Sequence, residues 1–149
     1  MSDVEQATYR LLIETYLMLD DGDRRVLRTF DLTNRQYQAL LLLPPGQRRY
    51  LTEMSNLLLC DKSNITGLVE RMVRDGLISR VRSEEDRRYL EIHATDEGIR
   101  LRNEAQTAHG RSIEARFESL TDAEQETLHR LLRKLAKGLR EQLDAGAER

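Results

Sequence analysis

Cysteine, proline, tryptophan and long apolar runs are scarce in this sequence of 149 residues, which has one cysteine, two prolines and no tryptophan. The single cysteine, Cys60, cannot form an intramolecular disulfide, so we expect a protein of the reducing cytoplasm. The longest apolar run, 39–43, is far shorter than the ~20 residues needed to cross a bilayer, so we expect no membrane partner. With only eight glycines, a collagen-like chain is excluded as well.

An excess of charge of one sign is also missing. Lys plus Arg number 24 and Asp plus Glu number 26, which gives a net charge of −2. Attraction over the whole surface therefore cannot hold a nucleic acid, and any contact with phosphate must come from arginines placed locally. The chain does have 39% apolar and 34% charged residues, which is typical of one compact domain of this length.

Helix-start signals recur along the chain. A capping box, in which a hydroxyl residue is followed three positions later by Glu or Gln, occurs at Ser2, Thr33 and Thr121. Asp61 and Thr95 are further N-cap candidates. With the apolar spacing that follows each signal, the pattern predicts helices over 3–29, 34–43, 52–59 and 62–75, and again from residue 95 to the end.

The periodicity changes in the middle of the chain. Residues 77–81 and 89–93 form short extended runs, and Leu90 and Ile92 alternate with polar neighbours as in a half-buried strand. The charged stretch 82–88 between them predicts the tip of a hairpin. The expected fold is therefore mainly α with a small β-hairpin.

Residues 51–93 combine a short helix, a tight turn, a second helix and a charged hairpin, which is the pattern of a winged helix-turn-helix. On the second of these helices, one face is apolar and the opposite face carries small polar groups that can hydrogen-bond base edges in a major groove. The candidates for base contact are Lys62, Ser63, Asn64 and Thr66, and Arg71 lies where contact with the DNA backbone is expected. A solvated helix face that is merely polar is the alternative.

The predicted hairpin concentrates arginine. Arg80, Arg82, Arg87 and Arg88 share it with the three acids at 84–86. One arginine can enter a narrow minor groove while an acid such as Asp86 braces another guanidinium, whose planar fork pairs with carboxylate or phosphate at two points. The hairpin therefore favours a DNA-binding wing with Arg82, Asp86, Arg87 and Arg88 as its site residues.

The last predicted helix carries an apolar stripe that needs a surface to bury against. The stripe consists of Leu128, Leu131, Leu132, Leu135, Leu139 and Leu143. Packing within the chain is one explanation. Because residues 51–93 already form a self-contained unit, we favour a two-fold homodimer, with 1–30 and 100–149 as the helical dimerisation region and 31–99 as the winged helix-turn-helix lobe.

Several motifs resemble the multiple-antibiotic-resistance regulator (MarR) family. They are Leu32-Thr33 with Gln36, the segments 51–54, 61–72 and 75–80, Asp86-Arg87-Arg88, and Thr95-Asp96-Glu97-Gly98. The resemblance implies a homodimeric transcriptional regulator, most often a repressor released by a small ligand, that binds a pseudo-palindromic operator in double-stranded DNA. By position it places Lys62, Ser63, Asn64 and Thr66 in the major groove and Arg88, or Arg87, in the minor groove, with Asp86 holding the wing.

The sequence departs from the family pattern at two places. Ala94-Thr95 stands where the family usually has Leu-Thr, a small loss of apolar volume. The three adjacent acids at 84–86 are expected to weaken contact of the wing with phosphate.

An effector pocket is also implied by the resemblance, with Tyr16 and Tyr37 as candidates to line it, although core packing explains these rings equally well. His93, His109 and His129 lack the spacing of metal ligands, and Cys60 fits a small apolar position before the recognition helix. No nucleophilic triad, glycine-rich phosphate loop or paired carboxylates occur in the sequence. We therefore expect no enzyme activity, no cofactor and no metal site.

Winged helices also bind proteins, and the near-neutral net charge permits this. A protein-interaction module without specific DNA binding is therefore the alternative function. The wing arginines favour nucleic acid over that alternative.

Overall fold

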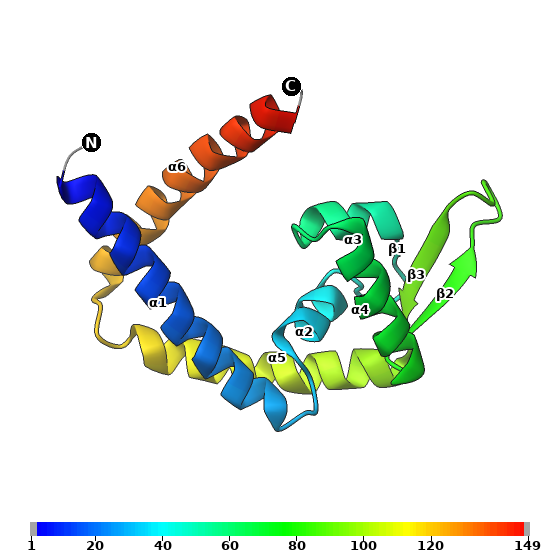
Figure 1. Ribbon diagram of the computed structural model, residues 1–149. Coiled ribbons are helices and arrows are strands. Elements are labelled where there is room, and N and C mark those ends of the chain that lie inside the picture. Colours follow the sequence, from blue (N-terminus) through cyan, green and yellow to red (C-terminus); the bar gives the residue numbers. More distant parts are fainter. Residues whose placement is uncertain (1–2, 148–149) are drawn as a thin grey trace. The chain divides into compact units, whose positions relative to one another are not determined.

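The structure is a computed structural model that describes residues 3–147, and it confirms a mainly α fold with a winged helix-turn-helix (Figure 1). The elements are α1 (Asp3–Arg28), α2 (Asn34–Leu41), β1 (Arg48–Tyr50), α3 (Leu51–Leu57), α4 (Lys62–Arg74), β2 (Ile78–Arg82), β3 (Leu90–Ala94), α5 (Asp96–Phe117) and α6 (Asp122–Ala147). The chain divides into two compact units, one up to Gly110 and one from Arg111. The predicted capping box at Ser2 lies outside the described residues.

Three strands, one more than predicted, form an antiparallel sheet in the order β1-β3-β2. Strands β2 and β3 are the predicted hairpin, displaced by one residue, with Ser79 paired to His93. Strand β1 was not predicted, and it pairs Arg48 with His93 and Tyr50 with Glu91. It has only three residues and runs directly into α3, so it is too short to show the alternation by which a strand is recognised.

The predicted helix starts are confirmed where the structure describes them. Thr33 and Gln36 form a reciprocal capping box at the start of α2. The Asp61 carboxylate accepts the Asn64 backbone N–H at 2.8 Å at the start of α4. Gly76, at φ +73°, follows the end of α4 in the left-handed conformation that glycine adopts without a steric penalty. Helix α2 ends at Leu41, two residues before its predicted end.

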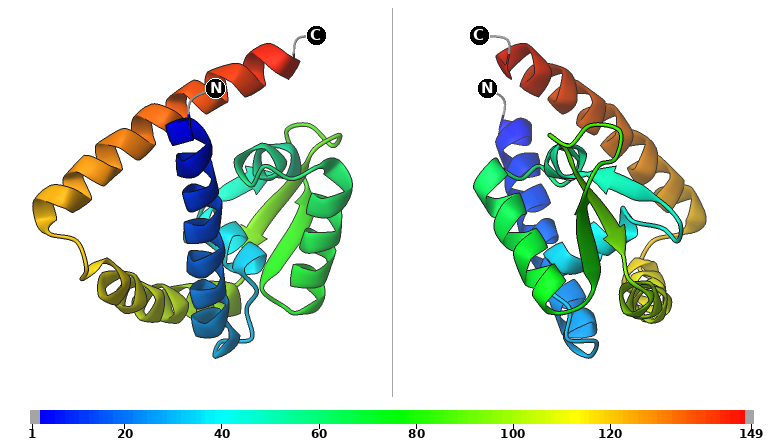
Figure 2. Two further views of the ribbon diagram at one scale, coloured as in Figure 1. Left: turned by 60° about the vertical axis from the view of Figure 1, so that its left-hand side comes forward. Right: turned by 90° about the vertical axis from the view of Figure 1, so that its right-hand side faces the viewer.

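Helices α2, α3 and α4 pack together against the sheet in the first unit (Figure 2). Their fully buried side chains include Leu40, Met54, Ile65, Met72 and Ile92. The same core therefore holds the second helix of the helix-turn-helix and the central strand of the wing. Within residues 3–147, no helix combines the length and the apolar character that a membrane span requires.

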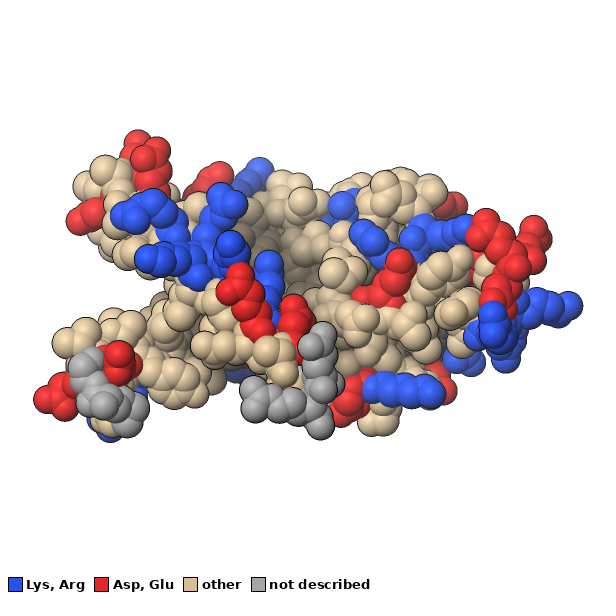
Figure 3. Space-filling view, turned by 90° about the horizontal axis from the view of Figure 1, so that it is seen from above, with Lys and Arg blue, Asp and Glu red and all other residues tan. Residues whose placement is uncertain are grey.

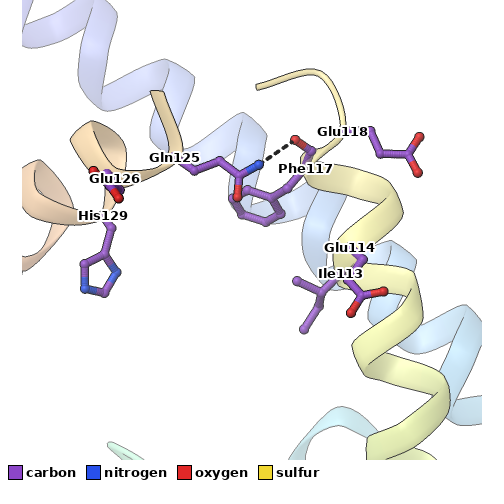
Figure 4. Close-up of a pocket in the computed structure, with 7 residues that line it drawn as sticks. All are labelled: Ile113, Glu114, Phe117, Glu118, Gln125, Glu126 and His129. Atoms are coloured by element: carbon purple, nitrogen blue, oxygen red, sulfur yellow. Dashed lines mark hydrogen bonds between the residues drawn. The ribbon is translucent and has the colours of Figure 1, made fainter. Parts of the chain in front are cut away.

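The second unit consists of the end of α5, a short turn and α6. The turn is closed by Gln125, whose side-chain amide donates to the Phe117 carbonyl at 3.3 Å (Figure 4). The same amide donates to the Leu120 carbonyl at 3.0 Å. The predicted capping box at Thr121 is present, because the Glu124 carboxylate accepts the Thr121 backbone N–H at 2.8 Å. Ile113 and Phe117 line an open cavity of about 670 Å³ together with Glu114, Glu118, Gln125, Glu126 and His129.

Candidate nucleic-acid interface

The first turn of α4 is organised by one carboxylate, that of Asp61. Besides capping the helix, it accepts hydrogen bonds from the Ser63 hydroxyl at 3.0 Å and from the Asn64 side-chain amide at 3.1 Å. These hydrogen bonds, the backbone N–H of Asn64 first among them, hold the pKa of Asp61 below its ordinary value. Asp61 therefore stays ionised at neutral pH and fixes the orientation of the two side chains that follow it.

The residues predicted to contact bases lie together on the outer side of α4. Lys62, Ser63 and Asn64 are exposed, and Thr66 is half-buried with its hydroxyl donating to the Lys62 carbonyl at 2.8 Å. Ser63 and Thr66 each use their single hydroxyl hydrogen within the helix, so both present mainly an oxygen acceptor outward. Arg71 is exposed two turns further along, while the opposite face of α4 is buried through Ile65, Leu68, Val69 and Met72.

Asp86 and Arg88 form a tight ion pair at the tip of the wing. The Arg88 guanidinium donates from Nε and Nη2 to both Asp86 carboxylate oxygens at 2.6–3.1 Å, and the Arg88 backbone N–H donates to Asp86 Oδ1 at 3.0 Å. These bonds from Arg88 hold the pKa of Asp86 below its ordinary value. The Arg88 side chain is nevertheless 84% exposed, so its orientation is fixed while its outer edge faces solvent.

Arg82 and Arg87 of the wing are linked by a hydrogen bond to the backbone. Arg82 donates from Nη1 to the Arg87 carbonyl at 3.0 Å, and both side chains are exposed. Seen from above, the tip of the hairpin at the right-hand end of the molecule carries basic and acidic side chains side by side (Figure 3). The structure thus brings Arg82, Asp86, Arg87 and Arg88 together at this tip, whereas Lys62, Ser63, Asn64 and Thr66 lie on α4.

Arg48 is a residue of this region that the sequence did not reveal. From β1 it donates to the Glu91 carboxylate of β3 and, at 3.1 Å, to the Glu85 carboxylate of the wing loop. Hydrogen bonds from Ser83 first and then from Arg48 hold the pKa of Glu91 below its ordinary value. No signal in the sequence could have found this pairing, because it depends on the register between β1 and β3.

The two tyrosines predicted to line an effector pocket do not lie in the same cavity. Tyr16 of α1 lines a cavity of about 520 Å³ together with residues of α2 and of the turn between α3 and α4. Tyr37 is not among its lining residues; it is 5% exposed and packs edge-on against the His109 ring, with 5.3 Å between ring centroids. Asn34 lines the same cavity, and its buried Oδ1 accepts no hydrogen bond within the described part of the chain.

Cys60, His93 and His109 have structural partners. Cys60 is half-buried against the core, and its carbonyl accepts a hydrogen bond from the Ser55 hydroxyl at 2.7 Å. His109 Nε2 lies 2.8 Å from Asp23 Oδ1, and His93 Nε2 lies 3.4 Å from Glu91 Oε2. Across residues 3–147, no three His, Cys, Asp or Glu side chains are grouped so that they could hold a metal ion.

Helices α1 and α6 expose many large apolar side chains. In α6, none of the residues whose burial is described is buried, and the predicted leucine stripe is between 37% and 63% exposed. In α1, Leu27 alone is buried among the described residues. Its exposed large apolar side chains are Val4, Tyr9, Leu11, Ile13, Tyr16, Leu17 and Met18. Exposed apolar surface on this scale marks an interaction site.

Comparison with known proteins identifies a consistent set of relatives. Residues 32–90 match the model of the MarR family. The uncharacterised HTH-type transcriptional regulator YpoP of Bacillus subtilis is 32% identical over 107 residues, which is 72% of this chain and 76% of the relative.

Solved structures share the fold over nearly the whole chain. The crystal structure of AbsC, a MarR family transcriptional regulator from Streptomyces coelicolor, is 26% identical with a TM-score of 0.86 and covers 95% of this chain and 97% of its own. A mutant MarR of E. coli in complex with operator DNA is 23% identical with a TM-score of 0.79, covering 85% of this chain and 91% of its own. At that identity the second likeness concerns the fold alone.

Proposed function

This chain belongs to the MarR family of transcriptional regulators. From that premise we propose that it is a homodimer that binds a specific, pseudo-palindromic operator. It represses transcription until a small ligand weakens its binding to DNA. In this proposal residues 31–99 are the DNA-binding lobe, whereas 1–30 and 100–149 form the dimerisation region. The regulator acts in the cytoplasm, on duplex DNA, and the chain is not an enzyme.

The observation that carries the proposal is the arrangement of α4. Its apolar face is buried in the core, and its N-terminal outer face exposes Lys62, Ser63 and Asn64, whose donors and acceptors suit base edges. The related MarR of E. coli, which has the same fold, was solved with operator DNA bound. Arg71, further along α4, is assigned to the DNA backbone.

The wing supplies the second contact in this proposal. Arg88 is oriented by Asp86 and exposed, which suits insertion into a narrow minor groove, and Arg82 and Arg87 lie beside it for phosphate contact. Two of the three adjacent acids are engaged, Glu85 by Arg48 and Asp86 by Arg88. Their charges are therefore compensated locally, so they weaken phosphate contact less than three free carboxylates would.

The homodimer is supported by the exposed apolar residues of α6 and α1. A two-fold dimer presents two copies of α4 and reads half-sites about 34–36 Å apart, one turn of B-DNA. If a ligand changes this separation, the second copy of α4 no longer fits its half-site, and the dimer loses most of its affinity for the operator.

We place the ligand in the cavity lined by Tyr16. Its apolar wall includes Leu41, Leu57 and Leu59, and the polar side chains of Arg35 and Gln38 also line it. Tyr37, which the sequence analysis also assigned to the pocket, keeps a role in packing because it lies in the core.

The experiment that tests DNA binding is selection of duplexes from a random pool with the purified protein at low salt, followed by sequencing. The expected result is enrichment of a near-palindrome whose half-site centres are about one helical turn apart. A pool that stays random would contradict sequence-specific binding by the ligand-free protein and would favour a winged helix that binds another protein.

A further inference from the structure

A chain of polar contacts runs from β1 to the tip of the wing. Arg48 donates to the Glu91 carboxylate, whose pKa Ser83 also lowers. The Asp86 backbone N–H donates to Ser83 Oγ at 3.5 Å, and the Asp86 carboxylate holds Arg88. These contacts connect β1, at residues 48–50, with the tip of the hairpin at residues 86–88.

The middle of this chain is buried, although the hairpin tip is exposed. Ser83 is 1% exposed and Glu91 is 5% exposed. A carboxylate that has lost most of its water needs charged or hydrogen-bonding partners. Among the partners that the structure shows for Glu91, Arg48 is the only one that always carries a positive charge, because His93 is charged only when protonated. Losing Arg48 would therefore force Glu91 to find other partners.

Arg48 also acts on the wing loop directly. Its Nη2 lies 3.1 Å from Glu85, the residue next to Asp86, and this draws the Glu85 carboxylate toward β1. The same guanidinium thus compensates an acid beside the Asp86–Arg88 pair and supports the buried carboxylate beneath it. The fork of an arginine is suited to bonding two carboxylates at once.

We propose that Arg48 and Glu91 are positioning residues for DNA binding, which act through Ser83 and Asp86 to hold the Arg88 guanidinium in the orientation that enters the minor groove. This inference rests on the proposed function. Arg48 itself needs no contact with DNA in this mechanism, since its two partners lie within the wing and the sheet.

The test is a double-mutant cycle on affinity for a duplex selected from the random pool, measured by fluorescence anisotropy. Arg48→Gln is expected to weaken binding about three- to tenfold in the wild-type background, because Arg88 then samples other orientations. In the Arg88→Ala background the same change is expected to weaken binding less than about twofold, since the residue through which Arg48 acts is gone.

A second variant, Ser83→Ala, interrupts the same chain without removing a charge and guards against loss of the fold. It is expected to show the same dependence on Arg88. Arg100→Gln is the matched control, because Arg100 likewise bonds two carboxylates, Glu97 and Glu104, but on α5. This control should leave affinity within about twofold of wild type.

The outcomes separate this inference from the proposed function. A wild-type protein that binds no duplex overturns both. Specific binding by the wild type with equal losses for Arg48→Gln in the two backgrounds, or with no loss at all, overturns the positioning role and leaves the DNA-binding function in place. Thermal unfolding of each variant, with a single transition as in the wild type, shows that the affinities refer to folded protein.

Discussion

Asp61 and Asp86 both orient neighbouring side chains, at two different places in the proposed DNA interface. The Asp61 carboxylate accepts hydrogen bonds from Ser63 and Asn64, two and three positions later, and the Asp86 carboxylate accepts them from Arg88, two positions later. Each consequently has a pKa below its ordinary value. The residues expected to meet DNA are thus oriented before DNA arrives, which lowers the entropic cost of binding.

Arg88→Ala is expected to weaken operator binding about tenfold and to relax discrimination at the base pairs under the wing, because an oriented arginine in a narrow minor groove is lost. Binding to a series of operators varied at those base pairs checks both effects. Arg87→Ala removes the same charge from the neighbouring residue and should lower affinity equally on all of them. If Arg87→Ala alone relaxes discrimination, the minor-groove residue is Arg87.

Asp61→Asn isolates the pH dependence of the α4 cap, since Asn is also a good N-cap but does not titrate. The pKa of Asp61 is lower in the folded state than in the unfolded state, so the ionised cap stabilises the fold at every pH above the unfolded-state pKa. This contribution to stability is lost as the pH falls through about 4 and below. The difference in free energy of unfolding between wild type and variant should therefore be constant near neutral pH and shrink in acid. A difference that is unchanged down to pH 2 would contradict the assignment.

At the scale of elements, the sequence predicted what local chemistry determines and missed what pairing determines. The caps at Thr33, Asp61 and Thr121 act within three residues of themselves, so their signals were readable and are confirmed. Strand β1 exists because β3 offers it an edge, and three residues carry no periodicity. The positions of Lys62 and Arg88 were predictable from motif order, whereas the support that Arg48 gives to the wing was not.

The Thr95-x-x-Gly98 motif has a clear role in docking α5. The Thr95 hydroxyl donates to the Gly76 carbonyl at 2.6 Å, accepts the Gly98 N–H at 3.1 Å, and the Thr95 backbone N–H donates to the Leu77 carbonyl at 3.0 Å. These bonds hold the start of α5 against the turn between α4 and β2. A Cβ at Gly98 would lie 2.0 Å from the Leu77 carbonyl oxygen. Only glycine fits this contact.

Gly98→Ala is therefore expected to lower the free energy of unfolding by about 1–3 kcal/mol, because the backbone of α5 or of residue 77 must move. Gly110→Ala, in the same helix, is the control; no heavy atom outside its own helix turns lies within 4 Å of its Cβ position, and the better helix propensity should stabilise by about 0.5–1 kcal/mol. Urea denaturation of both variants measures the difference. Equal stabilities would show that α5 does not dock as the structure has it.

At the scale of the whole molecule, the main question is what covers the leucines of α6. Each leucine that becomes buried in a partner contributes on the order of 1 kcal/mol, so a self-complementary contact of six from each chain is a substantial driving force. A charge placed in the middle of that contact appears twice in a two-fold dimer.

Leu135→Glu is accordingly expected to raise the dissociation constant of the dimer by at least about 100-fold, as measured by sedimentation velocity. Lys137→Gln makes the same change in net charge on the opposite side of α6, where its side chain is 80% exposed, and should leave the dimer intact. A monomeric wild type would contradict the homodimer, and a dimeric Leu135→Glu would place the interface elsewhere.

The absence of buried side chains in the described part of α6 has a consequence for how much folded regulator a cell holds. In the proposed homodimer α6 finds its core in a second chain and gains that stability by mass action, so the melting temperature should rise with protein concentration. Newly made chains at low copy number would then be the least stable and the most open to proteolysis. The concentration of the regulator would thereby help to set the lifetime of each molecule. In the proposed repressor, repression would then rise more steeply than the rate of synthesis.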